Sequence, residues 1–172
     1  DFILSHEEKQ KLNAPNITES LFPYCSDRLK DKLEFVTKII NITPKNFEFA
    51  SSRLKDSEEL LLMNLNNFRF SSERLRSKRS IVLQALRFDG VAIEYVSPEM
   101  LNDKEIITIA LNNRPTWFKS APKNIKNNRE FAFIAVKHFP GNILHLSDHL
   151  KKDKEIILMA IQADKSLFQY VS

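Results

Sequence analysis

Glycine and cysteine are scarce in this chain, which has two glycines, Gly90 and Gly141, and one cysteine, Cys25, among 172 residues. Phosphate-binding loops, dinucleotide fingerprints and nucleophile elbows each need several glycines at close spacing, so the sequence excludes these motifs. A single cysteine excludes an internal disulfide framework and favours a reducing compartment such as the cytoplasm. Few glycines and few alternating apolar runs also argue against a β-sandwich or a β-barrel.

Long apolar runs are missing as well. No stretch approaches the roughly 18 apolar residues of a membrane-spanning helix, and no secretory leader pattern opens the chain. Apolar residues make up 42% and charged residues 28% of the sequence, which is typical of a folded domain and not of a disordered chain. Because the first residue is Asp1 and not Met, we expect this chain to be part of a longer protein.

The chain does contain a repeat, with a period of 25 residues and one shorter step of 21. Each copy has a serine or proline followed three residues later by an apolar residue, usually with an aromatic residue two positions before it. A small-plus-aliphatic pair follows further on. Four positions keep the same phase over six units, which chance does not explain. The repeated position is occupied by Ser26, Ser51, Ser72, Ser97, Pro122, Ser147 and Ser172.

Each unit contains a predicted helix of about three turns. In one unit, Ile106, Ile107, Ala110 and Leu111 occupy positions i, i+1, i+4 and i+5 of a single helix face. The stretch DKEII opens this helix and occurs again 50 residues later, from Asp153. We interpret its Asp as an N-cap, its Glu as a complement to the helix dipole and its Ile-Ile pair as core.

Other units vary this pattern. Asn128 holds the capping position in one unit, and Asp56 lies one residue earlier in phase in another. A shorter helix precedes the long one, as in SPEML, where Ser97 suits the N-cap and Pro98 the first helical position. The stretch NNFRF predicts that the 21-residue step removes four residues from a connecting element. We expect left-handed C-caps near Asn41, Asn66, Gly90, Asn113, Gly141 and Asp164.

Together these patterns predict an all-α, solenoid-like stack of about six helical repeats, because no unit this small buries both of its faces alone. Residues 1–20 lie outside the period, and Ser5 to Glu8 fit a capping box, so we expect an N-terminal capping helix and link there. Residues 21–172 form the repeat array, which we expect to continue beyond Ser172.

The unit F/Y-A/V-S-x-x-L-x-x-D-x-E-x-x-x-x-A-L resembles the repeat of the domain of unknown function 4116 family. The resemblance covers about residues 21–172, and it implies tandem arrays within large proteins, including effectors that intracellular bacterial pathogens secrete into the host cytoplasm. It implies no enzymatic activity and no cofactor. The matching residues are Phe49, Ala50, Ser51, Leu54, Asp56, Glu58, Tyr95, Val96, Ser97, Asp103, Glu105, Ala110, Leu111, Asp153, Glu155, Ala160 and Ile161.

No catalytic, cofactor or metal site is predicted. The repeated Asp-x-Glu could be an acid–base pair, but a catalyst needs one such pair in one cleft, and this pair recurs along the array. His145 and His149, with His138 nearby, are the best metal candidates, yet His145 replaces an aromatic residue of the repeat. Cys25 has no family signature of a nucleophile around it, and we interpret it as a small core residue.

The strongest feature outside the predicted core is a basic segment, residues 68–87, which has six cations and one anion. It is either a solvated face or a contact for an acidic protein, anionic lipid or nucleic acid. The leading prediction is a non-enzymatic scaffold for protein–protein interaction; the alternatives are a nucleic-acid- or lipid-binding array and a fragment of an enzyme. Trp117 and Phe118 are predicted to pack in the core. The candidate contact residues are Arg69, Arg74, Arg76, Lys78, Arg79 and Arg87.

Overall fold

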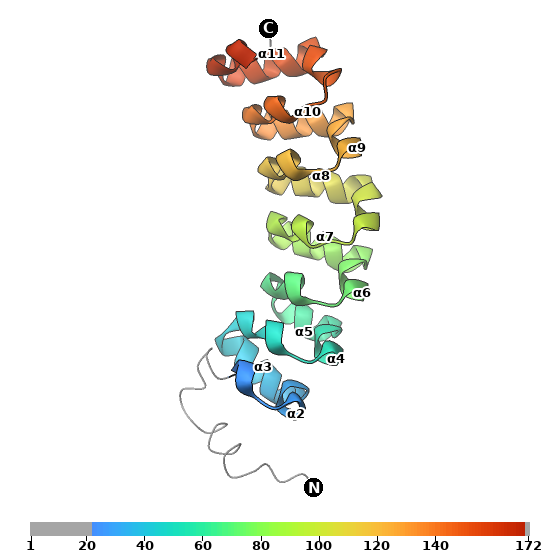
Figure 1. The fold of residues 1–172 in the computed structure, drawn as a ribbon, viewed down its shortest axis with the longest axis vertical. Coiled ribbons are helices and arrows are strands. Elements are labelled where there is room, and N and C mark those ends of the chain that lie inside the picture. Colours follow the sequence, from blue (N-terminus) through green and yellow to red (C-terminus); the bar gives the residue numbers. More distant parts are fainter. Residues whose placement is uncertain (1–21, 171–172) are drawn as a thin grey trace. The chain divides into compact units, whose positions relative to one another are not determined.

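The computed structural model describes residues 22–170, and within this range every regular element is an α-helix or a 3-10 helix (Figure 1). These residues belong to two compact units, one up to Leu75 and one from Arg76 onwards, and each is described by itself. The prediction of an all-α repeat array is confirmed. The expected N-terminal capping helix falls in residues 1–20, outside the described range.

Every repeat has the same three parts. A 3-10 helix is followed by a second short helix and then by a long α-helix. In the first unit these are η1 Phe22–Tyr24, α2 Asp27–Lys30, α3 Leu33–Ile42, η2 Pro44–Phe49, α4 Ser52–Lys55, α5 Glu58–Met63 and η3 Leu65–Phe70, with α6 Glu73–Arg76 at the boundary. In the second unit they are α7 Arg79–Phe88, η4 Gly90–Glu94, η5 Pro98–Asn102, α8 Lys104–Asn113, η6 Pro115–Ser120, α9 Lys123–Lys126, α10 Arg129–His138, η7 Pro140–His145, η8 Leu150–Lys152, α11 Lys154–Ala163 and η9 Lys165–Tyr170.

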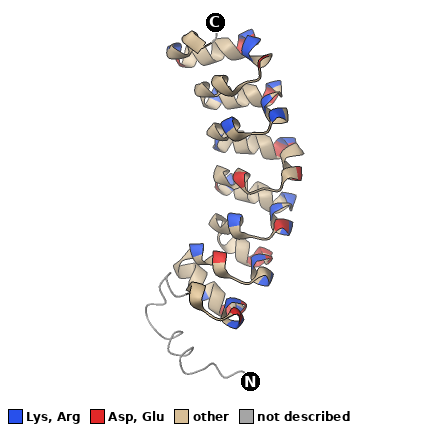
Figure 2. Ribbon diagram, viewed as in Figure 1, with Lys and Arg blue, Asp and Glu red and all other residues tan. Residues whose placement is uncertain are grey.

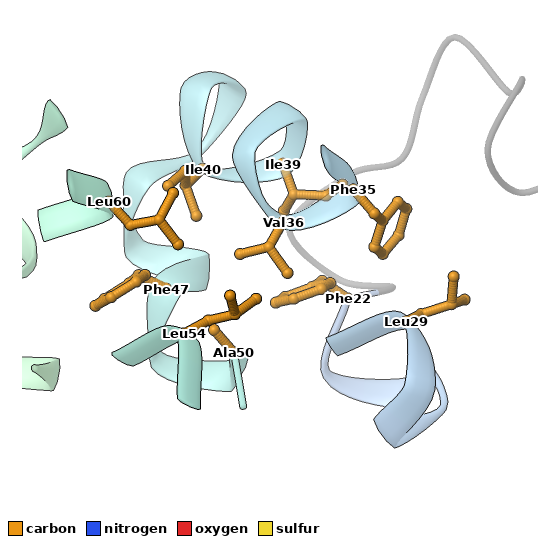
Figure 3. Packing of buried hydrophobic residues seen from close by; sticks show 10 residues of the cluster. All are labelled: Phe22, Leu29, Phe35, Val36, Ile39, Ile40, Phe47, Ala50, Leu54 and Leu60. Atoms are coloured by element: carbon orange, nitrogen blue, oxygen red, sulfur yellow. The ribbon is translucent and has the colours of Figure 1, made fainter. Parts of the chain in front are cut away.

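The first unit is organised around buried aromatic and aliphatic side chains (Figure 3). Phe22 and Phe47, both fully buried, come from η1 and η2 and face Val36 and Ile40 of α3. The Phe22 ring lies 5.8 Å from that of Phe35, centroid to centroid. Cys25 packs at the edge of this cluster, as its interpretation as a core residue predicts.

In the second unit, α7, α8, α10 and α11 lie side by side in chain order (Figure 1). The predicted face of α8, from Ile106 to Leu111, is fully buried between its neighbours. Trp117 and Phe118 of η6 are 7% and 0% exposed, so the prediction that they pack in the core is confirmed. Phe168 holds the same position in η9 as Phe118 in η6, yet it is 67% exposed.

The long helices do not end in left-handed residues, so that prediction is wrong for the described part of the chain, where no residue has a positive φ. Except for α8, which ends at Arg114 with φ −142° and ψ 71°, they end at extended residues, and a 3-10 helix begins directly afterwards. Asn64, Asp89 and Asp164 each accept a hydrogen bond from the backbone N–H two residues on, at 2.9–3.1 Å. These side chains cap the 3-10 helix that follows, in place of the left-handed helix ends that the sequence predicted.

Gly90 is required by close packing, not by its backbone conformation. It is the first residue of η4, and a Cβ there would lie 2.9 Å from Cβ of Arg114 and 3.1 Å from Cβ of Asn113 at the end of α8. Gly141 lies one position later in its own 3-10 helix, next to the ring of Phe139. The two glycines therefore do not share one structural position, contrary to the expectation that both are C-caps.

The 21-residue step shortens a long helix and not a connection, so the predicted deletion in the connecting element is wrong. Helix α5 has six residues where α3 has ten, whereas η3 keeps the six residues of η2. Four residues are close to one α-helical turn, so their loss keeps the buried face in phase. Leu60 and Leu61 supply that face, and Asn64 is the cap of η3.

We expect Phe118→Ala to lower the free energy of unfolding by about 3–5 kcal/mol, because it opens a cavity between packed repeats. The matched control is Phe168→Ala, at the same repeat position but exposed, which should cost less than about 1 kcal/mol. Urea denaturation followed by circular dichroism measures both. Equal losses would contradict the described packing.

Candidate functional site

Charged side chains join the first turns of successive long helices in the second unit. Arg79, the first residue of α7, contacts two carboxylates at the start of α8, with Nε 2.6 Å from Asp103 Oδ2 and Nη2 2.5 Å from Glu105 Oε2. Arg87, two turns further along α7, contacts the other oxygen of Glu105 at 3.1 Å. Two of the candidate cations therefore converge on one glutamate.

The same arrangement recurs one helix pair later. Arg129 of α10 contacts Asp153 at 2.7 Å and Glu155 at 2.5 Å at the start of α11. Between these two sites, Lys104 of α8 contacts Glu130 of α10 at 2.7 Å. In each case, the cation at the first position of one helix meets the glutamate at the second position of the next. Because the first turn of each long helix lies beside the first turn of the next, these helices run in the same direction.

The repeated aspartates also cap their own helices. Asp103 Oδ1 accepts hydrogen bonds from the N–H groups of Glu105 and Ile106, at 2.9 and 3.2 Å. Asp153 and Asn128 make the equivalent pairs. The capping prediction is confirmed for these three residues.

For Asp56 the capping prediction is wrong. This residue ends α4, and the cap of α5 is Ser57, whose side chain accepts from the Leu60 N–H at 3.3 Å. The Asp56 carboxylate is engaged elsewhere. Its Oδ1 accepts a short hydrogen bond from Ser72, and Arg74 Nε contacts both of its oxygens at 2.9 and 3.0 Å.

The same set of contacts, a serine and an arginine on one aspartate, occurs one repeat earlier in the first unit. Ser51 Oγ donates to Asp31 Oδ1 at 2.5 Å, Arg53 Nε lies 3.0 Å from the same oxygen, and Arg53 Nη2 donates to the Asp31 backbone oxygen at 2.6 Å. The sequence signal was present as a Lys-Asp pair followed by Ser-x-Arg-Leu, at Ser51 to Leu54 and again at Ser72 to Leu75. It joins residues of two repeats, which a search within one repeat does not connect.

These contacts lower the pKa values of the carboxyls. The hydrogen bond from Arg79 chiefly holds the pKa of Asp103 below its ordinary value, and Arg129 does the same for Asp153. Hydrogen bonds from Ser51 and then Arg53 lower the pKa of Asp31. A carboxyl held ionised in this way is a poor proton donor near neutral pH, and these carboxylates already accept hydrogen bonds within the array.

Most of the candidate contact residues have a partner in the structure. Arg74 pairs with Asp56, and Arg79 and Arg87 pair with Glu105. Arg69 is exposed, with its guanidinium carbon 4.2 Å from the centroid of the Phe70 ring.

The two remaining residues, Arg76 and Lys78, differ in exposure. Arg76 is half-buried, and its Nη1 donates to the Tyr95 carbonyl at 3.4 Å, whereas Lys78 is exposed at the start of α7. Arg69 and Arg74 belong to the first unit, and the other four residues to the second. Figure 2 shows how basic and acidic residues are distributed along both.

The histidines are dispersed. His149 Nδ1 lies 3.1 Å from Ser147 Oγ, and His145 is half-buried at the end of η7. Among residues 22–170, no three His, Cys, Asp or Glu side chains are placed to hold a metal ion. No helix in the same range is long and apolar enough to cross a membrane.

Sequence reasoning missed a group of lysines around His145. Lys119, Lys126 and Lys151 come from the short helices η6, α9 and η8, and Lys126 Nζ donates to the Lys119 carbonyl at 2.7 Å. Burial and then the positive charges of these three lysines lower the pKa of His145. The signal in the sequence was an absence, since no acidic residue stands between Glu105 and Glu130.

Comparison with known families identifies the class of protein. The family described as Domain of unknown function (DUF4116) matches residues 57–100, 78–126 and 128–172, which together cover more than half of the chain. The chain therefore belongs to this family. No curated protein and no solved structure matches it. Each matched segment contains two long helices. Arg79 and Arg129 are likewise two long helices apart along the chain, and so are the two DKEII copies.

We expect Asp103→Ala to lower the free energy of unfolding by about 1 kcal/mol, because it removes the helix cap. Asp103→Asn should cost less, since Asn128 caps α10 with the same geometry and only the contact with Arg79 is lost. Urea titrations at low and high salt separate the two effects, because salt screens the ion pair. Equal losses for both variants would contradict the capping role.

Acid should destabilise the wild type more than the double variant Asp103→Asn, Asp153→Asn. Both carboxyls have a folded pKa below the ordinary 3.8, so the stability they contribute is present above that value. It is lost as the pH falls through the lowered pKa values, between about pH 5 and about pH 2. Thermal melts across this range measure the difference, and parallel curves for the two proteins would contradict it.

Proposed function

We propose that the chain is a non-enzymatic helical-repeat scaffold that binds other proteins through the exposed side chains of its repeats. One observation carries the proposal. The position three residues before the repeated serine or proline is occupied by Glu94, Lys119 and Leu144 in the second unit and by Glu48 and Arg69 in the first. All five are exposed, and they comprise two glutamates, an arginine, a lysine and a leucine. Repeat proteins recognise partners with such a regular backbone carrying unlike side chains.

The contacts of the repeated carboxylates support the non-enzymatic part of this proposal. Asp103 and Asp153 cap helices and bind arginines, so both oxygens of each are engaged within the array. The pattern that most resembled an acid–base pair in the sequence has a sufficient structural explanation. What remains for recognition is the set of exposed residues that the repeats do not share.

The alternative, a nucleic-acid- or anionic-lipid-binding array that uses the basic segment, receives less support. Binding phosphates requires available cations, and Arg74, Arg79 and Arg87 already contact carboxylates at 2.5–3.1 Å. A reducing, cytoplasmic setting, or the host cytoplasm for a secreted effector, is part of the proposal. It rests on the single Cys25 and on the family resemblance.

Affinity capture tests the scaffold proposal. The tagged wild type and two surface variants, Glu48→Lys with Arg69→Glu and Lys119→Glu with Leu144→Glu, are compared by quantitative mass spectrometry. We expect recovery of at least one protein to fall by about tenfold in one variant, which corresponds to an interface contact worth about 1.4 kcal/mol. Lys137→Gln, an exposed change in α10, is the control.

Two outcomes would overturn the proposal. The first is that no captured protein depends on either surface change while both variants melt like the wild type. The second is salt-dependent binding of labelled RNA or of anionic vesicles by the wild type with no protein partner, which would favour the alternative.

A further inference from the structure

One ion pair recurs at three successive junctions between the long helices of the second unit. The cation at the first position of one helix contacts the glutamate at the second position of the next. The pairs are Arg79 with Glu105, Lys104 with Glu130 and Arg129 with Glu155, at 2.5–2.7 Å. The first position of a long helix is therefore the place where this array receives an acidic side chain from its neighbour.

Lys154 holds the first position of α11, the last long helix that the structure describes. Its side chain is exposed, and among residues 22–170 no carboxylate pairs with it. Each of the three cations at the same position of the preceding helices has such a partner. The charge of Lys154 is thus placed for a carboxylate that the described residues do not supply.

The apolar positions beside this lysine are exposed as well. Ile157 and Ile161 are only partly buried, whereas the residues at the same two positions of α8 and α10 are 0% exposed. Leu158 is 57% exposed, and Phe168 is 67% exposed although its counterpart in η6 is fully buried. The fully buried counterparts in the two helices are Ile107, Leu111, Ala132 and Val136.

These side chains belong to one surface. Lys154, Ile157, Leu158 and Ile161 occupy positions i, i+3, i+4 and i+7, which lie on one side of an α-helix. Helix η9, which carries Phe168, packs against α11. We call the surface formed by these five residues the α11 face. It combines an apolar stripe with a cation at one end.

The structure shows what covers the same surface in the preceding repeats. Helix α10 lies against α8 and η6, and α11 lies against α10 and η7. Both covering helices begin at a capping Asp or Asn, and both have a glutamate at the second position, an apolar residue at the third and an alanine at the seventh. The small alanine permits close approach of the helices. This pattern defines the kind of helix that fits the α11 face.

We propose that the α11 face binds an α-helix of a partner protein that carries this pattern. The inference rests on the proposed scaffold function and names the chemistry of one of its ligands. The acidic residue in the first turn of the partner helix pairs with Lys154, and its apolar residues pack on Ile157, Leu158 and Ile161. Because the ion pair joins first turn to first turn, the bound helix runs in the same direction as α11.

A second copy of this chain is a less suitable occupant. The third-position residues of all six long helices within residues 22–170 are at most 9% exposed, so a second copy would have to open its own core to present one. The glutamates of α8, α10 and α11 at the second position already contact cations. A helix whose apolar and acidic residues are both available therefore comes from a different protein.

A labelled synthetic peptide of residues 102–120 is a suitable probe, because it contains α8 with its cap and η6 and thus has the required pattern. Fluorescence anisotropy with the whole chain measures its affinity. We expect saturable binding that Leu158→Glu with Phe168→Glu weakens by about tenfold or more, since apolar contacts are replaced by charges. The matched control is Phe88→Glu with Phe139→Glu, at aromatic residues of the same unit that are 56% and 45% exposed. It should change the affinity by less than about twofold.

Charge reversal tests the ion pair directly. Lys154→Glu should weaken binding of the peptide about fivefold, because an attraction between exposed charges becomes a repulsion. A peptide with Glu105→Lys should bind this variant as tightly as the original peptide binds the wild type, since the pair is formed again with its charges exchanged. Lys137→Glu, at an exposed lysine of α10, is the control and should affect both peptides by less than about twofold.

Three results would overturn the proposal. The first is absence of saturable peptide binding, and the second is equal weakening by the α11 face and control variants. The third comes from sedimentation velocity, where dimerisation of the wild type that is lost in Leu158→Glu with Phe168→Glu would assign the face to a second copy. Should this double variant fail to melt like the wild type, the single variant Leu158→Glu and the charge reversal carry the same comparison.

Failure here differs from failure of the scaffold proposal. If the peptide does not bind but a captured protein is lost with Glu48→Lys and Arg69→Glu, the scaffold stands and the α11 face is not its contact. If no captured protein depends on any surface change, the scaffold itself falls.

Discussion

The structure depends on one constraint, which is that a repeat of about 25 residues has too little apolar surface to form a core of its own. Each repeat buries its shared apolar residues only against the repeat beside it. Phe118 and Phe168 occupy the same position, yet the first is fully buried and the second is 67% exposed. The apolar residues keep their phase along the chain because each must meet the same surface on the next repeat.

Electrostatic contacts are built onto this packing. A cation at the first position of a long helix can reach the second position of the next only because the packed helices run in the same direction with their first turns aligned. Arg79 and Arg129 use this geometry identically, with Lys104 between them. The two DKEII copies are thus acceptors for arginines of the preceding repeat as well as caps. Each matched family segment likewise contains two long helices.

Under the proposed scaffold function, recognition uses the exposed side chains that the packing of the repeats does not specify. Exposed positions of equal register carry Glu94, Lys119 and Leu144, which contribute nothing common to the fold. Selection on the core permits such variation, because substitutions at exposed sites usually change stability little. The basic segment looked exceptional in the sequence, but three of its five arginines, Arg74, Arg79 and Arg87, contact carboxylates of the array.

The sequence by itself determined the helical phase, the buried faces and the caps at Asp103, Asn128 and Asp153. These features depend on residues within a few positions of one another, so periodicity and local hydrogen bonding specify them. Tertiary structure alone decided that Asp56 binds Arg74, that the four missing residues shorten α5, and that Gly90 is needed beside Arg114. It also decided which cations are paired. The physical reason is distance along the chain, because these contacts join residues 16 or more positions apart, and only the packing of one repeat on the next brings them together.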